Sequence, residues 1–164
     1  MQLPVHILAI LESDDVQNFA ALCKKKTCSF GGERMSFLHL AAKYSPGLEI
    51  AKYCIQSLKI KPSVKTGRRK LTALHYAAAQ GNFDLVNYLL DLPAISINAA
   101  RKGGATPFLA AVKHDHSDIA VTLLTRGACI DTVDKRRWNA VHWACRNGNF
   151  ALFQVLMHLS LIHI

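Results

Sequence analysis

The sequence predicts an all-α fold, a solenoid in which helix–turn–helix units stack side by side. Three segments share one residue pattern: LTALHYAAAQGNFDLVNYLL (71–90), ATPFLAAVKHDHSDIAVTLL (105–124) and WNAVHWACRNGNFALFQVLM (138–157). A fourth copy at 35–55 fits with one residue inserted after Ser45. The equivalent apolar positions Leu38, Leu74, Phe108 and Val141 lie 36, 34 and 33 residues apart. A period near 33 residues is typical of two-helix units that bury their apolar faces only against a neighbour.

The composition agrees with one continuous core. Apolar residues form 51% of the 164 positions, yet no run approaches the roughly 18 residues of a membrane span. The apolar start lacks the positive region and the small-residue cleavage site of a secretory signal. We therefore expect an intracellular protein that does not span a membrane, in the cytoplasm or alternatively in the nucleus.

Five scattered cysteines form no disulfide framework, which favours a reducing compartment. Cys54 and Cys145 fall on apolar positions of the repeat, where we expect the thiol to be buried as a small hydrophobe. Cys23 and Cys28 are separated by four residues and lack a second pair of ligands, so a structural zinc site is not expected. The sequence predicts no metal and no cofactor.

Each repeat begins with a residue suited to cap a helix. Its side-chain oxygen accepts a hydrogen bond from a first-turn amide, which contributes about 1 kcal/mol. Pro107 suits the first helical position, because the amide it lacks is not needed there. Paired small residues such as Ala77 and Ala78 let helices approach closely, and the first helix is expected to end near Gly81 or Gly148. The four cap residues are Ser36, Thr72, Thr106 and Asn139.

A second helix follows in each unit. Its apolar residues have helical spacing. The clearest two sets are Leu85, Val86, Leu89 and Leu90, and Leu152, Phe153, Leu156 and Met157.

These units resemble ankyrin repeats, whose pattern centres on T-P-L-H-x-A-A-x-x-G. The resemblance covers about residues 31–158, with Leu74-His75, Leu38-His39 and Val141-His142 on the core of the motif. It implies an ankyrin-repeat solenoid with short β-hairpin fingers between helix pairs. Four clear repeats follow a divergent N-terminal one. The expected units are a capping repeat at 1–30, repeats at 31–66, 67–100 and 101–133, a truncated repeat at 134–158 and an apolar tail at 159–164.

The departures from the motif are single losses that keep the period. Leu109 replaces the motif histidine, and Asp115 and Ser45 replace the turn glycine. The histidines His39, His75 and His142 recur at one repeat position, which favours a shared structural role. The resemblance implies that each ties a turn together through hydrogen bonds to the backbone.

His114 and His116 could mimic a metal-ligand cluster together with Asp115 and Asp118. They lie at an expected helix–helix turn, where a solvated turn is the favoured interpretation. No catalytic residue is expected either, because the chain has no nucleophile elbow, phosphate-binding glycine loop or H-E-x-x-H motif.

Basic residues gather between the repeats. The net charge is +9, from 20 Lys and Arg against 11 Asp and Glu, and nine of the 20 lie in three segments that hold one acid, Asp134. Charged loops keep a solenoid soluble, but like charges held in register repel each other unless an acidic partner uses them. In an ankyrin stack these segments would form a basic edge. The nine residues are Lys65, Arg68, Arg69, Lys70, Arg101, Lys102, Lys135, Arg136 and Arg137.

The resemblance also implies where a partner would bind, namely at the finger tips and at the exposed positions before the turn glycine. Trp138 stands beside the last basic segment, and aromatic and Arg side chains are enriched at interface hot spots. A ring packed over its own hairpin is an equally open interpretation of Trp138. The expected partner-binding residues are Arg68, Arg69, Gln80, Lys102, Lys113, His114, Lys135, Arg136, Trp138, Arg146 and Asn147.

The sequence thus predicts a non-enzymatic protein-interaction module or scaffold with an acidic or extended partner segment. One alternative is the binding of a polyanion, either nucleic acid or anionic lipid, which a sequence pI near 9.5 permits. Another is the cytosolic repeat region of a larger channel or regulatory protein. The apolar end HLSLIHI favours this second alternative, because terminal repeats normally have a polar outer face.

Overall fold

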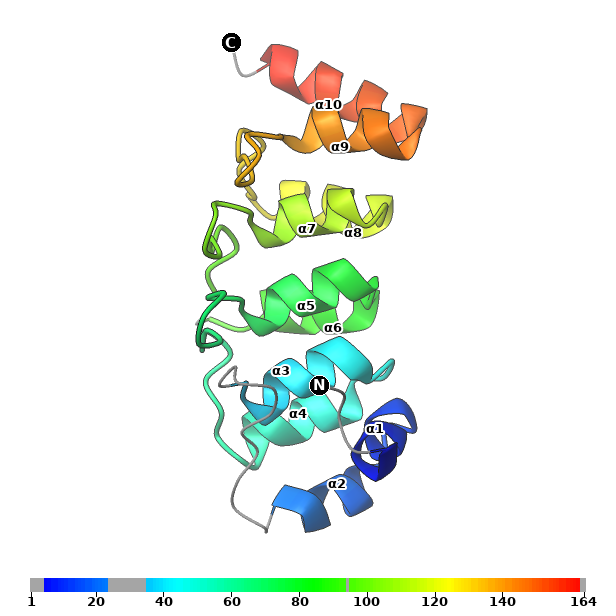
Figure 1. Cartoon of the computed structure of the whole chain (residues 1–164), viewed down its shortest axis with the longest axis vertical. Helices are drawn as coiled ribbons and strands as arrows, with labels where there is room; N and C mark the ends of the chain where they lie inside the picture. The colour runs from blue at the N-terminus through cyan, green and yellow to red at the C-terminus, as the bar shows by residue number, and fades with distance from the viewer. Residues whose placement is uncertain (1–4, 24–34, 94, 163–164) are drawn as a thin grey trace.

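The computed structural model describes residues 5–23, 35–93 and 95–162. These residues form helix pairs stacked along one axis, with the connections between pairs on one edge (Figure 1). The described chain contains no strand. The helices are α1 (Val5–Glu12), α2 (Val16–Cys23), α3 (Phe37–Tyr44), α4 (Glu49–Gln56), α5 (Ala73–Gln80), α6 (Phe83–Leu90), α7 (Pro107–Lys113), α8 (Ser117–Thr125), α9 (Ala140–Asn147) and α10 (Phe150–Ile162).

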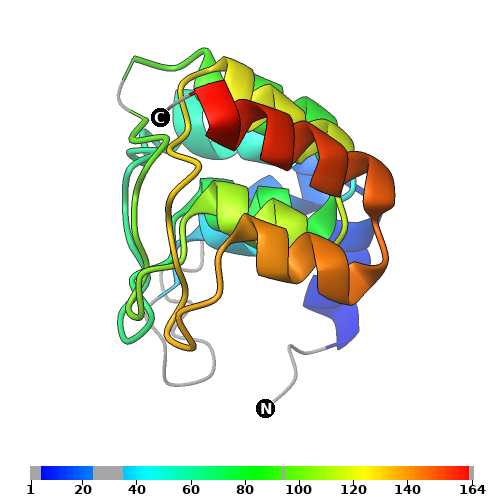
Figure 2. The ribbon, with the colours of Figure 1, turned by 90° about the horizontal axis from the view of Figure 1, so that it is seen from above.

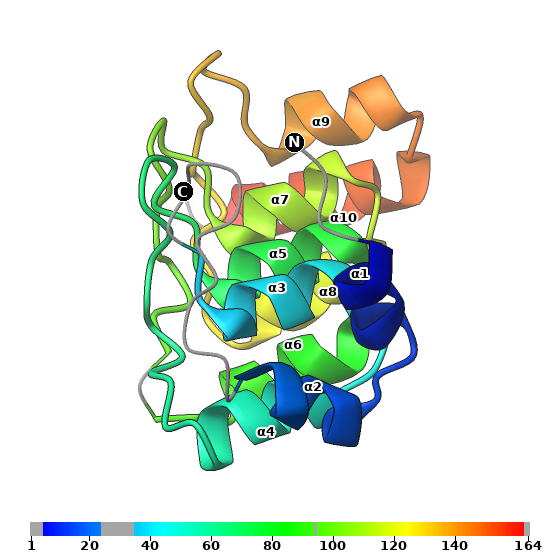
Figure 3. The same cartoon turned by 60° about the horizontal axis from the view of Figure 1, so that its bottom comes forward.

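The helices lie in two layers. Figures 2 and 3 show α3, α5, α7 and α9 in one row, here called the inner layer, and α4, α6, α8 and α10 in the other, the outer layer. Contacts run from α3 to α5, from α5 to α7 and from α7 to α9. The connections bend toward the inner layer (Figure 2). The surface between these connections and the inner helices is therefore the concave side of the stack.

One hydrophobic core runs through the whole stack. It extends from Leu11 and Phe19 in the first pair to Leu152 and Leu156 in α10. The small residue Ala77 is fully buried, as the close approach of neighbouring inner helices requires. The all-α solenoid predicted from the period is confirmed, and the divergent N-terminal unit contributes a helix pair to it.

The predicted cap positions are confirmed at all four repeats. Ser36, Thr72, Thr106 and Asn139 each occupy the N-cap of an inner helix. The side-chain oxygens of Thr106 and Asn139 accept amides of the first turn, whereas the hydroxyls of Ser36 and Thr72 lie 2.7 and 2.8 Å from Nδ1 of the histidine three residues later. Gly81 and Gly148 end α5 and α9 in the left-handed conformation, with φ of 79° and 70°. Asp115 takes the same conformation in the third repeat, with φ of 65°. Ser45 stays extended at φ −85°, because the inserted residue reroutes this turn through Pro46 and Gly47.

Buried histidines join two of the repeats, those that contain His39 and His75, to the finger that follows each. The Thr72 amide and hydroxyl lie 3.2 and 2.8 Å from His75 Nδ1, and His75 Nε2 donates to the Ala105 carbonyl 3.2 Å away in the following finger. His39 makes the same link to the carbonyls of Val64 and Leu71, at 3.0 and 3.2 Å. The structural role predicted for this position is confirmed at both residues.

The fingers are tight turns without paired strands. A backbone hydrogen bond joins the two arms of each finger, from the amides of Thr66, Arg101 and Asp134 to the carbonyls of Leu71, Ala105 and Trp138. The second and third fingers also contain a turn bond, from Gly104 to Arg101 and from Arg137 to Asp134. In the first and third fingers, the backbone amide at the end of the turn donates to a side-chain oxygen instead of a backbone carbonyl. A second backbone hydrogen bond between the two arms therefore does not form. These oxygens are Thr66 Oγ1 for Leu71, at 3.0 Å, and Asp134 Oδ1 for Trp138, at 3.1 Å.

Three expectations need correction or fall outside the described residues. Cys54 is buried, and burial raises the pKa of its thiol to about 12, but Cys145 is exposed. Its equivalent Ala78 is covered by the next helix pair, and no helix pair follows α10 in the described chain. The expected boundary at residue 158 falls within a helix, since α10 continues to Ile162. Cys28 lies outside the described residues.

Candidate functional site

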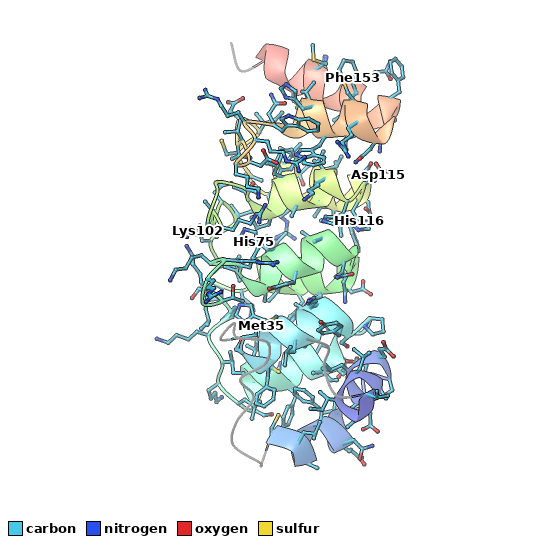
Figure 4. All side chains as sticks on the ribbon, viewed as in Figure 1. Met35, His75, Lys102, Asp115, His116 and Phe153 are labelled. Atoms are coloured by element: carbon cyan, nitrogen blue, oxygen red, sulfur yellow. The ribbon has the colours of Figure 1, made fainter. Side chains whose placement is uncertain are left out.

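A hollow of about 200 Å³ lies on the concave side, between the fingers and α5, α7 and α9. We call it the inner pocket. Figure 4 shows His75 at the finger end of α5 and Lys102 on the finger edge, while Asp115 and His116 lie on the opposite edge of the stack, at a helix–helix turn. His75 also lines the inner pocket. The side chains that matter for its chemistry are Arg69, Arg101, Lys113, His114, Asp134 and Trp143.

The repeat register explains why this hollow exists. Tyr76, Ala110 and Trp143 occupy equivalent positions, 34 and 33 residues apart, on three consecutive inner helices. All three line the inner pocket. Ala110 has only a methyl group where its neighbours carry large rings, so space remains between the rings of Tyr76 and Trp143.

Basic side chains surround the pocket. Arg69 and Lys113 are exposed, and Arg101 is half-buried. Burial lowers the pKa of His114, and the charges of Lys113 and His116 lower it further. These effects favour the neutral form of His114. The cationic character of the pocket comes from the two arginines and the lysine.

Asp134 is the acidic residue of the pocket lining. It is only 8% exposed, and its Oδ1 accepts hydrogen bonds from the amides of Arg136 at 2.8 Å and Trp138 at 3.1 Å. This carboxylate is thus held inside the third finger, where it shapes the turn. The charge that the pocket presents remains net positive.

Two tryptophans and two cations form a cluster at the upper wall of the pocket. The rings of Trp138 and Trp143 meet edge to face, with centroids 5.0 Å apart. The Lys113 ammonium lies 5.1 Å from the centroid of the Trp143 ring, and the Arg146 guanidinium lies 5.6 Å from Trp138 and 5.7 Å from Trp143. Such cation–π contacts contribute about 0.5–1 kcal/mol each at exposed sites. Trp138 also stacks on His142, so its ring packs on α9.

Trp143 carries an unsatisfied donor. The residue is 5% exposed, and its Nε1 is buried without a hydrogen-bond partner among the described residues. Buried polar atoms in folded proteins almost always have a partner. The unpaired indole N–H of a residue that lines a basic hollow is therefore a candidate contact for a ligand.

The structure brings together only some of the predicted partner-binding residues. Arg69, Lys113 and His114 line the inner pocket, and Trp138 and Arg146 border it through Trp143. Further predicted residues lie exposed on the three fingers, outside the pocket lining. These are Arg68, Lys102, Lys135 and Arg136.

Two predicted residues lie elsewhere. Gln80 borders a separate hollow at the helix–helix turns, beside Tyr44 and Asn82. Asn147 donates from Nδ2 to the carbonyl of Val112, at 2.9 Å, and so links α9 to α7. The contacts of Asn147 thus serve the stack itself.

Sequence reasoning missed Trp143 and Tyr76, and it placed Arg101 on the basic edge but not among the partner-binding residues. The signal for the aromatic pair was present, because Tyr76 and Trp143 follow the motif histidine directly while Ala110 stands between them in the repeat register. Nothing in the sequence indicated that the Trp143 indole would be left without an acceptor. That property depends on the packing of Trp138 and the two cations around it.

Another hollow, of about 600 Å³, lies between α8, the loop after it and α10. Its walls are mainly apolar, and Asp131 is its charged residue. Among the described residues, no three His, Cys, Asp or Glu side chains are placed to share a metal ion. The described helices include none with the length and apolar character to traverse a bilayer. Of these two hollows, the inner pocket is the one lined by several charged side chains.

A family model of three consecutive ankyrin repeats matches residues 5–101 and again residues 92–163. The chain belongs to the ankyrin repeat family. Ankyrin repeats generally mediate protein–protein interaction.

Similar proteins include the ankyrin repeat protein nuc-2 of Neurospora crassa, 30% identical over 51% of this chain. A probable E3 ubiquitin-protein ligase of Oryza sativa subsp. japonica, XBOS32, is 26% identical over 79% of the chain. The serine/threonine-protein kinase TNNI3K of Mus musculus is 31% identical over 74% of it. The matched stretches make up 8%, 25% and 16% of these three proteins, so the chain spans at most a quarter of their length.

Proposed function

We propose that this chain is a non-enzymatic interaction module that binds an acidic, extended segment of a partner protein along its fingers and inner pocket. The observation that carries the proposal is the location of the positive charge. Exposed basic residues of three successive fingers lie on one edge (Figures 1 and 2), and Arg69, Arg101 and Lys113 continue that charge into the pocket.

The spacing of the stack suits an extended peptide. Packed helices lie about 8–10 Å apart, so four inner helices span about 30 Å. An extended chain covers about 3.3 Å per residue, and about ten residues would therefore reach from the first finger to Trp143. Such a segment could place several acidic side chains against successive fingers.

The rigidity of the stack would contribute to affinity. The finger turns are fixed by backbone bonds and the inner helices by the continuous core, so little order has to be gained on binding. The exposed finger charges would mainly accelerate the encounter with an acidic partner. We place this binding inside the cell, because Cys54, Cys129 and Cys145 form no disulfide.

A charge-reversal pair tests the proposal. In the finger variant, Arg68→Glu and Arg136→Glu reverse one exposed charge on each of two fingers. In the matched control, Lys59→Glu and Lys61→Glu make the same change in net charge beside the end of α4, where the Ile60 amide bonds to the Cys54 carbonyl. The probe is a fluorescein-labelled peptide of about twelve alternating Glu and Ser residues, with a Gln–Ser peptide as its neutral counterpart.

We expect fluorescence anisotropy to show binding of the acidic peptide but not of the neutral one. The finger variant should weaken binding at least about tenfold, equivalent to about 1.4 kcal/mol, and the control less than about threefold. Melting temperatures should stay within about 2 °C of the wild type, since surface changes rarely alter stability much. Equal weakening in both variants, or unfolding of the finger variant, would contradict specific binding of the peptide at the fingers.

Binding of nucleic acid is the competing hypothesis. A single-stranded oligonucleotide that displaced the peptide at lower concentration, with a slope against salt near one per contacted phosphate, would favour the polyanion alternative. We expect the peptide to bind more tightly than the oligonucleotide at physiological salt.

A further inference from the structure

We infer that the inner pocket receives one acidic side chain of the partner segment, and that the indole N–H of Trp143 donates a hydrogen bond to its carboxylate. This inference rests on the proposed function, since it names the ligand group for the same surface. It adds a specificity residue, Trp143, that lies outside the finger charges.

The first support is the unsatisfied donor. Trp143 is the residue whose buried side-chain polar atom has no partner in the described part of the chain. An indole N–H can only donate, so the group that would satisfy it must be an acceptor. Leaving a buried donor unpaired costs stability, and a bound acceptor would remove that cost.

The second support is the charge around this donor. Lys113 lies over the Trp143 ring, and Arg69 and Arg101 line the same hollow. Asp134 faces the pocket as well, but two finger amides engage its Oδ1. Three cations and a neutral donor favour an ionised acceptor, and a carboxylate accepts through both oxygens.

The third support is the shape and lining of the pocket. Its volume is about 200 Å³, and Tyr76, Leu109 and Ala110 give it apolar walls below the cations. A glutamate side chain presents methylene groups to such walls and its carboxylate to the charged rim. A small free anion would leave the apolar walls without a contact.

Entry of the ligand requires movement of Lys113 and Arg146. Both side chains are long and exposed, and both cover the Trp143 ring through cation–π contacts. An arriving carboxylate attracts these cations more strongly than a neutral ring does. Their displacement onto the carboxylate would uncover the Trp143 ring.

Removal of the N–H tests this contact. Trp143→Phe keeps an aromatic ring and deletes the donor, and Tyr88→Phe on α6 is the matched control, since it deletes an aromatic donor in the outer layer. With the labelled Glu–Ser peptide, Trp143→Phe should weaken binding about tenfold, as expected for a hydrogen bond to a charged group. Tyr88→Phe should leave the affinity unchanged within about threefold.

A blocking variant tests the pocket without touching the donor or any charge. Ala110→Leu places a branched side chain between Tyr76 and Trp143, and we expect it to weaken peptide binding about tenfold while the melting temperature stays near that of the wild type. Unchanged affinity in both Trp143→Phe and Ala110→Leu would overturn the inference. Equal binding of the peptide and of free acetate or inorganic phosphate would also overturn it.

A fluorescence signal supports the test if Trp143→Phe folds poorly. Trp138 and Trp143 are the two tryptophans of the chain, so in the Trp138→Phe protein the emission reports Trp143 alone. We expect the Glu–Ser peptide to shift or quench that emission, and the Gln–Ser peptide to leave it unchanged. Emission that does not respond to bound acidic peptide contradicts the contact.

The outcomes separate this inference from the proposed function. If the finger variant weakens binding while Trp143→Phe and Ala110→Leu do not, the interaction surface stands and the pocket contact is wrong. If none of the three affects binding, both are wrong. If all three weaken it and the matched controls do not, both are supported.

Discussion

The middle repeats and the last repeat carry the same motif in different surroundings. His75 is 1% exposed and contacts the next finger, whereas His142 is exposed and bonds to Asn139 of its own cap. Leu74 is fully buried, but its equivalent Val141 is only partly so. A helix pair of this stack is therefore completed by the pair that follows it.

The two regions therefore differ in the role that we expect for their side chains. In the middle, side chains from one repeat satisfy backbone groups of the next, and the junctions hold the stack together. In the last repeat, the exposed face of α9 carries Arg146 beside Trp138 and Trp143. We expect mutations in the middle to change mainly stability, and mutations near Trp143 to change mainly binding.

The largest expected effect comes from the motif histidines. His75→Ala leaves the Thr72 amide and the Ala105 carbonyl without their buried partner, so we expect a loss of about 2–3 kcal/mol in the free energy of unfolding. His142→Ala removes an exposed capping interaction and should cost under about 1 kcal/mol. Urea denaturation of both variants measures the difference, and equal losses would show that the following finger contributes nothing.

The turn glycines give a second matched pair. Both have positive φ, which costs an added side chain roughly 1–2 kcal/mol. A Cβ on Gly81 would also lie 2.6 Å from the His116 ring, while nothing lies within 4 Å of a Cβ on Gly148. His116 Nε2 bonds to the Ala79 carbonyl at 3.2 Å, so its ring does not move away freely.

We therefore expect Gly81→Ala to destabilise the protein by about 1 kcal/mol more than Gly148→Ala. Thermal unfolding followed by circular dichroism can resolve this gap. A larger loss for Gly148→Ala would contradict the view that the next repeat adds the extra constraint.

Acid should weaken the junction between His75 and the finger that follows it. Burial lowers the pKa of His75 to about 4, with smaller contributions from Arg101, Lys65 and His39. Below the unfolded pKa of 6.5 the unfolded chain binds a proton that the folded chain does not. The contribution of neutral His75 to the free energy of unfolding is thus complete above pH 6.5, and it declines as the pH falls toward 4.

Between pH 7 and pH 5 we expect this one residue to cost about 2 kcal/mol of stability. His75→Gln cannot bind the proton, and although it is less stable at pH 7, its stability should change by about 2 kcal/mol less over that range. Urea midpoints at the two pH values measure this, and identical pH profiles for the variant and the wild type would exclude His75 as the cause.

The smallest expected effect concerns two strained finger residues. Lys70 and Arg137 have φ of 58° and 61°, a conformation that costs most residues but not glycine. Lys70→Gly and Arg137→Gly should each stabilise the protein by about 0.5–1 kcal/mol, after the greater entropy of glycine in the unfolded chain is counted. Because this strain is local, the gain should be equal in the middle and at the last repeat, and unequal gains in urea unfolding would contradict that view.

The sequence was sufficient to predict the features that depend on local chemistry and on the repeat period. Thr72, Pro107 and Gly81 each occupy the helix position that their own side chains or backbone preferences favour. Once the period is known, the equivalence of His39 and His75 follows directly. The stacked all-α architecture was therefore predictable before any coordinates.

The remaining features depend on neighbours that no single repeat specifies. Cys145 has an apolar position in the motif but is exposed, because its burial would require another helix pair. The first and third fingers lack strands because Thr66 and Asp134 accept amides through their side chains. The unsatisfied Trp143 donor results from the tertiary packing of Trp138, Lys113 and Arg146 around its ring, and the repeat pattern alone gives no sign of it.

The most direct test of the central claim is a ¹⁵N–¹H NMR titration of the wild-type protein with the Glu–Ser peptide. We predict that the largest shifts will be those of the Trp143 indole resonance and of the amides of Arg69, Arg101 and Lys113. Amides of α6 and α8 in the outer layer should change little. Shifts concentrated on α8 and α10, with the Trp143 indole unchanged, would contradict binding of an acidic segment on the concave side.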